Sequence, residues 1–291
     1  MGPDGYVVVD KPSGWTSHDV VARCRRLIGT RRIGHAGTLD PSATGVLVVG
    51  VGRATRLLRY VTVTTKSYVG EIVLGTGTTT LDAEGEVTSR ADMGDVDLDD
   101  VRRAALGLTG HIEQLPPMVS AVKHEGRRLY DLARQGKEVD RTPRTVEISR
   151  FEITPTLEEG VYRAAVDCSS GTYVRVLAAD LGERLGGVAH LRALRRTAVG
   201  PFLESDALPL ENLSAESVLA PAGLVRHLGS AVLSGAQVED VSHGKLLERA
   251  ALGVVGPGPW ALLDAGGALV AVAEPRGLER VHPAVVLRSA G

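Results

Sequence analysis

The segment over residues 33–47, with the sequence IGHAGTLDPSATGVL, carries the residue types best suited to chemistry. It places His35 and Asp40 five positions apart, between a basic segment and an apolar one, and its three glycines and one proline restrict its conformation. Catalytic side chains concentrate in loops held by rigid flanking elements. Asp-Pro-Ser is also an ordinary turn or capping sequence. The spacing alone therefore leaves two interpretations open, a catalytic carboxylate or a structural turn.

Several kinds of chemistry lack their sequence motifs. The chain has no HExxH zinc motif, no GxSxG nucleophile motif and no second carboxylate at a fixed spacing. The stretch LGTGTTT lacks the lysine that a phosphate-binding P-loop needs. Cys24 and Cys168 are far apart, with no CxxC spacing, so we predict neither a disulfide framework nor a metal site. One carboxylate remains, in a loop surrounded by arginines.

The charge distribution is more informative than the net charge. A formal charge of -2 and a pI near 6.5 argue against a nucleic-acid partner. However, residues 23–59 hold eight arginines against one acid, and residues 82–100 hold eight acids against one arginine. A local basic patch can meet phosphates whatever the net charge is. The alternative is that these charges are solvated helix faces.

Hydrophobic periodicity predicts alternating strands and helices. A first helix should follow Ser17 as N-cap and end at Gly29, and Thr172 should cap a helix that ends at Gly186. We expect residues 76–100 to form a peripheral surface hairpin and loop. Apolar, β-branched runs predict strands at residues 5–10, 45–52, 66–75, 144–154 and 161–168. Further helices are predicted at residues 53–61, 98–108 and 126–136.

These elements indicate an α+β fold with a mixed, mainly antiparallel central sheet flanked by helices. With 43% hydrophobic residues, the chain can bury a full-sized core. The character changes near residues 228–231, where short strand-like pieces and glycines begin. We therefore expect a domain of residues 1–228 and a small β-rich domain of residues 229–291 docked against it. No run is long enough to span a membrane, and the N-terminus lacks a signal-peptide layout, so we expect a cytoplasmic protein.

Along essentially its whole length, the sequence resembles the TruB family of tRNA pseudouridine synthases. Five blocks carry the resemblance in the family's order: KPSGWTSHDVV (11–21), GHAGTLDPSATG (34–45), LGTGTTTLDAEG (74–85), LPPMVSAVKHEGRRLYDLARQG (115–136) and CSSGTYVRVLAADLG (168–182). One departure is Ala36, where many bacterial members have threonine. The resemblance implies a pseudouridine synthase catalytic domain followed by a PUA-like domain.

The resemblance also assigns roles to individual residues. Asp40 corresponds to the catalytic aspartate, which attacks either carbon 6 of the uracil or the anomeric carbon of the sugar. Arg175 corresponds to the residue that pairs with this aspartate, although a helix-surface arginine is the plain alternative. Tyr68 corresponds to the aromatic that stacks on the target uracil, and Tyr173 to the tyrosine under the flipped base. Tyrosines on alternating strands are otherwise often core residues.

Other positions are expected to contact the RNA. His35 corresponds to a histidine that holds everted loop nucleotides, or it is a loop-stabilising hydrogen bonder, and Leu194 to a leucine lining the uracil pocket. Lys11 either supports the catalytic loop or touches the RNA backbone. Candidate phosphate contacts are Arg192, Arg195 and Arg196, together with the arginines of residues 23–59.

The family implies a stand-alone enzyme that modifies uridine 55 in the T-arm stem-loop of tRNAs. Its small C-terminal domain is expected to contact the acceptor arm. A redox-neutral isomerisation needs no cofactor, so we expect none. We also expect no metal, no guide RNA and no membrane partner, and we expect the protein to be a monomer. Two rivals remain, a guide-RNA-dependent catalytic subunit of the dyskerin type and a non-catalytic RNA chaperone. The blocks at residues 74–85 and 119–136 favour the stand-alone type over the first, and the set of Asp40, Arg175 and Tyr68 weighs against pure binding.

Overall fold

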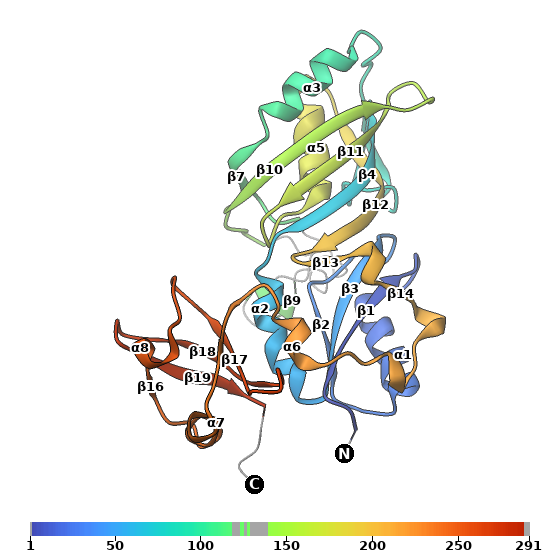
Figure 1. Ribbon diagram of the computed structural model, residues 1–291. Helices are drawn as coiled ribbons and strands as arrows, with labels where there is room; N and C mark the ends of the chain where they lie inside the picture. Colours follow the sequence, from blue (N-terminus) through green and yellow to red (C-terminus); the bar gives the residue numbers. More distant parts are fainter. Residues whose placement is uncertain (1, 118–122, 125–126, 129–138, 288–291) are drawn as a thin grey trace.

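Two β-sheets organise the chain, and helices cover them (Figure 1). The computed structural model describes residues 2–117, 123–124, 127–128 and 139–287. The larger sheet is antiparallel except where β1 pairs with β14 and β3 with β12. Its order is β14 (Leu208–Pro209), β1 (Gly5–Lys11), β3 (Thr44–Val51), β12 (Ala189–Val199), β4 (Lys66–Leu74), β11 (Val161–Cys168), β10 (Arg144–Pro155) and β7 (Gly110–Gln114), with β2 (Ile33–Ala36) on β3 and β13 (Phe202–Leu203) on β12. The predicted α+β class is confirmed.

Helices pack on both faces of this sheet. These helices are α1 (Ser17–Ile28), α2 (Leu58–Thr62), α3 (Leu98–Leu106), α5 (Val174–Arg184) and α6 (Pro221–Leu224). Helices α7 (Gly235–Ser242) and α8 (Arg249–Leu252) contact the second sheet instead. Successive side chains of β1 and of β3 point to opposite faces of the sheet. Val7 and Val9 belong to the apolar cluster that includes α1. Val8 belongs to the cluster that includes α2 and the second sheet. Burial on both faces explains why these strands are almost continuously apolar. No helix among the described residues is long and apolar enough to cross a bilayer.

The first helix begins one residue earlier than predicted. Thr16 is its N-cap: its side chain accepts from the Asp19 amide, and the Asp19 side chain accepts from the Thr16 amide, so the two form a capping box. Ser17 is instead the first helical residue, and it is buried. Gly29 ends the helix in the left-handed conformation, as the sequence predicts.

Strand β12 is central in the sheet and was not predicted, because its arginines obscure the alternation of a buried strand. It pairs with β3 on one side and β4 on the other, and so joins the two halves of the sheet. Helix α5 packs against it, but Thr172 does not cap this helix. Tyr173 is the N-cap residue, without a side-chain cap, and the Thr172 hydroxyl donates to the Ser169 carbonyl instead.

Residues 76–100 do form a hairpin, of β5 (Thr76–Thr78) and β6 (Val87–Arg90). The expectation that this whole segment is peripheral is wrong, because Thr78 and Asp82 are buried. The predicted helix at residues 53–61 is a 3-10 turn (Gly52–Leu57) followed by α2. Of the helix predicted at residues 126–136, Arg127–Arg128 form strand β9, paired with β8 (Lys123–His124), and the remainder lies outside the described residues.

The second sheet packs against α2 (Figure 1). Its order is β15 (Gly229–Val232), β17 (Trp260–Leu263), β18 (Leu269–Arg276), β19 (Arg280–Val286) and β16 (Leu247–Glu248). One apolar cluster contains both Leu57 and Val272, and the Tyr60 hydroxyl donates to the Glu274 carboxylate at 2.8 Å. Arg59 also pairs with Glu274, and Arg56 donates to the Val286 carbonyl. Part of the basic segment therefore holds the two sheets together.

Candidate active site

Buried polar groups support the loop between β2 and β3, which carries Asp40. The Lys11 ammonium is fully buried and donates to the carbonyls of Trp15 and Pro41 at 2.6 and 3.0 Å. Burial lowers the pKa of Lys11 to about 8. The Ser17 hydroxyl accepts from the Leu39 amide at 2.9 Å and lies 3.3 Å from the Leu39 carbonyl. Of the two roles left open for Lys11, these contacts are those of loop support.

Gly45 permits the close approach of β3 to β12. Its φ of 99° lies in the region that favours glycine, and a Cβ here would lie 2.2 Å from the Arg196 carbonyl oxygen. The Arg196 guanidinium in turn donates to the carbonyls of Val46 and Gly37 at 2.7 and 3.1 Å. The last glycine of GHAGTLDPSATG thus allows β12 to hold the loop that carries Asp40.

We expect Gly45→Ala to destabilise the protein severely. Gly110→Ala is the matched control, because Gly110 has a φ of 85° but no atom within 4 Å of its Cβ position. The control should lose about 1–2 kcal/mol from the left-handed backbone alone. Gly45→Ala adds a backbone clash and should lose about 2 kcal/mol more. Urea unfolding measures both, and equal losses would contradict the close approach.

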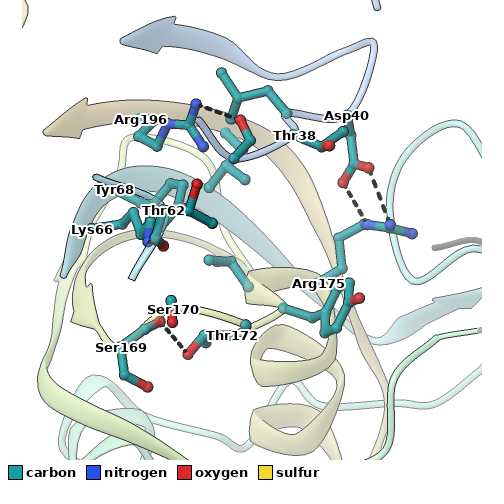
Figure 2. Close-up of a pocket in the computed structure, with 16 residues that line it drawn as sticks. Thr38, Asp40, Thr62, Lys66, Tyr68, Ser169, Ser170, Thr172, Arg175 and Arg196 are labelled. Carbon is teal, nitrogen blue, oxygen red and sulfur yellow. Dashed lines mark hydrogen bonds and ion pairs between the residues drawn. The ribbon is translucent and has the colours of Figure 1, made fainter. Parts of the chain in front are cut away.

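Asp40 and Arg175 meet across the mouth of a cavity (Figure 2). The Arg175 Nε donates to Asp40 Oδ2 at 2.9 Å, and its Nη2 to Asp40 Oδ1 at 3.3 Å. The Arg175 side chain is only 4% exposed, whereas that of Asp40 is 40% exposed. The pair therefore consists of a buried guanidinium and a carboxylate open to the cavity. This bidentate geometry fixes the orientation of the Asp40 carboxylate.

Asp82 is a further member of this site that the sequence interpretation did not single out. Its carboxylate lies 3.4 Å from Arg175 Nε, and the Arg175 Nη1 donates to the Thr80 carbonyl at 2.8 Å. Asp82 also accepts from the hydroxyl of Thr80 and the amide of Glu84. Asp82 and Thr80 therefore hold the Arg175 guanidinium beside Asp40. In the sequence, Asp82 was marked only by its place in the block LGTGTTTLDAEG. That block does not indicate which residues Asp82 contacts.

The cavity has a volume of about 370 Å³, which falls within the usual range for small-ligand sites and can take one nucleoside. Tyr68, Tyr173 and Leu194 all line it, as their predicted roles require. Tyr68 is 9% exposed, and burial raises the pKa of its phenol, which stays neutral at physiological pH. The walls come from the loop carrying Asp40, from α2, β4 and β12, and from the turn before α5. Chain segments far apart in sequence thus form one site.

Lys66 also lines the cavity, and the sequence interpretation missed it. It lies two residues before Tyr68 on β4, so the two share one face of the strand. Its side chain is buried and bonds to the carbonyls of Thr62 and Thr64. The two-residue alternation of side chains along a strand could have predicted that Lys66 lies beside Tyr68.

Of the remaining predicted residues, Arg192, Arg195 and His35 do not line this cavity. Arg192 pairs with Glu71 and Glu158, and Arg195 bonds to both carboxylate oxygens of Asp10 and pairs with Glu204. Arg196 is 1% exposed and lines the cavity instead of the surface. His35 lies on β2, half-buried, with its ring edge-on to that of His18 at 5.4 Å between centroids. The RNA contacts predicted for Arg192, Arg195 and His35 remain predictions.

Known proteins with similar sequences are pseudouridine synthases. A protein of Rhodococcus jostii named tRNA pseudouridine synthase B is 46% identical over 293 residues, which cover 98% of this chain and 94% of that protein. One of the same name from Thermobifida fusca is 48% identical over 284 residues, covering 94% and 95%. Together with the fold and the site, these relatives define the class: the protein is a pseudouridine synthase, an isomerase.

The chain belongs to the TruB family. Residues 25–174 match the family described as TruB family pseudouridylate synthase (N terminal domain), and residues 175–222 match the tRNA pseudouridylate synthase B C-terminal domain. The second match covers α5 and β12, so it lies within the larger sheet.

Solved structures support the fold. A chain in the crystal structure of a Cbf5-Nop10-Gar1 complex aligns with a TM-score of 0.78 and 26% identity, covering 98% of this chain and 85% of that one. A chain in the archaeal box H/ACA sRNP Nop10-Cbf5 complex aligns with a TM-score of 0.74 and 25% identity, covering 98% and 86%. Both chains share the fold along nearly the whole of this protein.

Proposed function

We propose that this enzyme converts uridine 55 in the T-arm of tRNAs to pseudouridine, without a guide RNA. The observation that carries the proposal is the Asp40–Arg175 pair at the mouth of a nucleoside-sized cavity with Tyr68 in its wall. Relatives named tRNA pseudouridine synthase B are 46% and 48% identical, compared with 25% and 26% for the Cbf5 chains. That difference supports tRNA as the substrate and guide-independent action.

Asp40 is the attacking group in this proposal. Its carboxylate bonds either to carbon 6 of the uracil or to the anomeric carbon, the glycosidic bond breaks, and the uracil reattaches through carbon 5. A carboxylate can serve as nucleophile and leaving group in turn, so the isomerisation needs no cofactor. Arg175 orients the Asp40 carboxylate, and Asp82 holds Arg175 in place.

The target uridine must leave its stack to reach the cavity. Tyr68 replaces part of the lost stacking, and Tyr173 supports the base from the turn before α5. Leu194 supplies an apolar wall that keeps water from the reacting carbons. His35, on β2 outside the cavity, holds the neighbouring everted nucleotides.

The tRNA is held by two units of the chain, residues 1–228 at the T-arm and residues 229–291, of PUA-like type, at the acceptor arm. The five-stranded second sheet supports this division. Phosphates bind Arg192 and Arg195 by replacing the carboxylates that pair with them in the free protein, while Arg196 supports the loop. The enzyme acts as a monomer in the cytoplasm.

Position mapping in one tRNA tests the proposal. An unmodified full-length transcript incubated with the enzyme alone should gain one pseudouridine, at position 55, detected by mass spectrometry of nuclease fragments. A transcript with cytidine at 55 should gain none. An isolated T-arm stem-loop should be modified at the same uridine with a higher KM, because it lacks the acceptor arm.

Three outcomes would count against the proposal. Modification at another uridine would contradict the assigned position, and modification that requires added guide RNA would favour the dyskerin-type reading. Tight binding of the transcript without any pseudouridine would favour an RNA chaperone.

A further inference from the structure

Two buried cations form the wall of the cavity that lies across from the Asp40–Arg175 pair (Figure 2). Lys66 is 6% exposed and Arg196 is 1% exposed. The Lys66 ammonium donates to the carbonyls of Thr62 and Thr64, and the Arg196 guanidinium to those of Val46 and Gly37. Within the described part of the chain, neither cation forms an ion pair with a carboxylate. Tyr68 lies in the same wall.

Two positive charges in this position are costly to keep. Burying a charge without a counter-charge is unfavourable, and burial together with the nearby Arg196 lowers the pKa of Lys66 to about 8. Lysine does satisfy carbonyls at the end of α2, as basic side chains at helix C-termini often do. However, a neutral donor would satisfy the same carbonyls without the desolvation cost. The charge itself therefore needs another explanation.

The reaction supplies an anion in the same cavity. If an Asp40 oxygen bonds to the anomeric carbon, the glycosidic bond breaks and its electron pair moves onto the uracil. The resulting negative charge is shared by N1, O2 and O4 of the uracil. If it bonds to carbon 6 instead, the pair of the C5–C6 double bond moves onto C4–O4 as an enolate. In both routes Asp40 becomes an ester and the uracil ring carries one negative charge, partly on its carbonyl oxygens. In the carbon-6 route the bond between N1 and the anomeric carbon then breaks, with its electron pair left on N1, as carbon 5 bonds to the anomeric carbon. In both routes Asp40 finally leaves with the electron pair of its C–O bond, from the anomeric carbon in the first route and from carbon 6 in the second. Carbon 5 loses its proton and N1 gains one.

We propose that Lys66 and Arg196 stabilise the negative charge that develops on the uracil carbonyl oxygens while Asp40 is esterified. This inference rests on the proposed role of Asp40 and adds two residues to the reaction. Both cations are fixed by backbone carbonyls before the substrate arrives, so no reorganisation is required when the charge forms. Such preorganised groups stabilise a transition state much more than the neutral ground state.

Lys66→Met and Lys66→Arg test the inference in the full-length protein. Single-turnover pseudouridine formation at saturating enzyme should fall about 10²-fold or more in Lys66→Met. Lys66→Arg keeps the charge and should remain within about 10-fold of the natural protein. The Kd for tRNA should stay the same in both, because the charge acts after binding. Arg103→Met, at an exposed cation of α3 that pairs with Asp100 and does not line the cavity, is the control and should be fully active.

The pH profile separates this electrostatic role from a helix-capping role. The rate should fall as pH rises through about 8, because Lys66 loses its proton there. The groups facing Lys66 are the Arg196 guanidinium, Tyr68 and Cys168. Burial raises the pKa of Tyr68 and raises that of Cys168 to about 11, so neither accounts for the loss. Lys11 also has a pKa of about 8, but it does not line the cavity, and a fall caused by Lys11 would stay at the same pH in Lys66→Arg. In Lys66→Arg the fall should move to higher pH.

Two results would overturn the inference: an unchanged rate in Lys66→Met, or equal losses in both variants with a lower melting temperature, which is the behaviour of a helix cap. Asp40→Asn in the same assay keeps the two proposals distinguishable. If it is inactive while Lys66→Met is fully active, only the role of Lys66 fails. If it is as active as the natural protein, the role of Asp40 fails.

Discussion

Pseudouridine formation is expected to fall by about 10⁴-fold or more in Asp40→Asn. The amide is close in size to the carboxylate but cannot act as an anionic nucleophile, so no covalent step can begin. Because the Asp40 carboxylate is oriented by Arg175 and not by the fold of its own turn, the variant should keep its structure. Release of tritium from carbon 5 of labelled uridine in tRNA measures the rate.

Binding provides the control for this variant. Asp40→Asn should bind tRNA with a Kd close to that of the natural protein, because one side chain at the mouth of the cavity adds little to a surface that contacts many phosphates. Asp10→Asn is a matched substitution, since Asp10 is also a carboxylate bonded to an arginine, Arg195, but does not line the cavity. It should retain most of the activity. Equal activity of Asp40→Asn and the natural protein would remove Asp40 from the chemistry.

Arg175→Ala should slow the reaction by about 10²–10³-fold while leaving the Kd for tRNA within a few-fold. The side chain is 4% exposed and bonds to Asp40 at both of its oxygens. Its removal leaves Asp40 without its orienting partner and Asp82 as a buried carboxylate without a cation beside it. Turnover should therefore suffer more than binding.

The design must separate this effect from a loss of folding. Arg184→Ala is the matched control, because Arg184 is on the same helix but is exposed. Single-turnover rates should be normalised to the folded fraction from thermal unfolding. If the folded Arg175→Ala protein turned over at the natural rate, the Asp40–Arg175 pair would have no catalytic role.

Much of the fold follows from local patterns. The β-branched run of β11 and the apolar run of β3 lie within one residue of their predicted bounds, because both bury side chains against cores that any strand there must have. Strand β12 escaped prediction for the opposite reason. Its arginines are buried or paired through partners on β1, β3 and β4 that lie more than 100 residues away.

Two helix N-caps predicted from local motifs were wrong. Ser17 and Thr172 are residue types that commonly cap helices, but each side chain bonds elsewhere, Ser17 to Leu39 and Thr172 to Ser169. A hydroxyl bonds to the group that the tertiary structure brings near it. The sequence supplies the hydroxyl but does not say which group it will bond to.

By itself the sequence determined the class of protein and named Asp40, Arg175, Tyr68, Tyr173 and Leu194 as candidate site residues, because the family motifs place these residue types in order along the chain. Only the tertiary structure decided that Arg175 lies between Asp40 and Asp82, and that Lys66 and Arg196 share the opposite wall of the cavity. The physical reason is that ion pairing and burial depend on distances in space. Here those distances are set by sheet order and loop support, which bring together cavity-lining residues as far apart in sequence as Gly37 and Arg196, 159 positions.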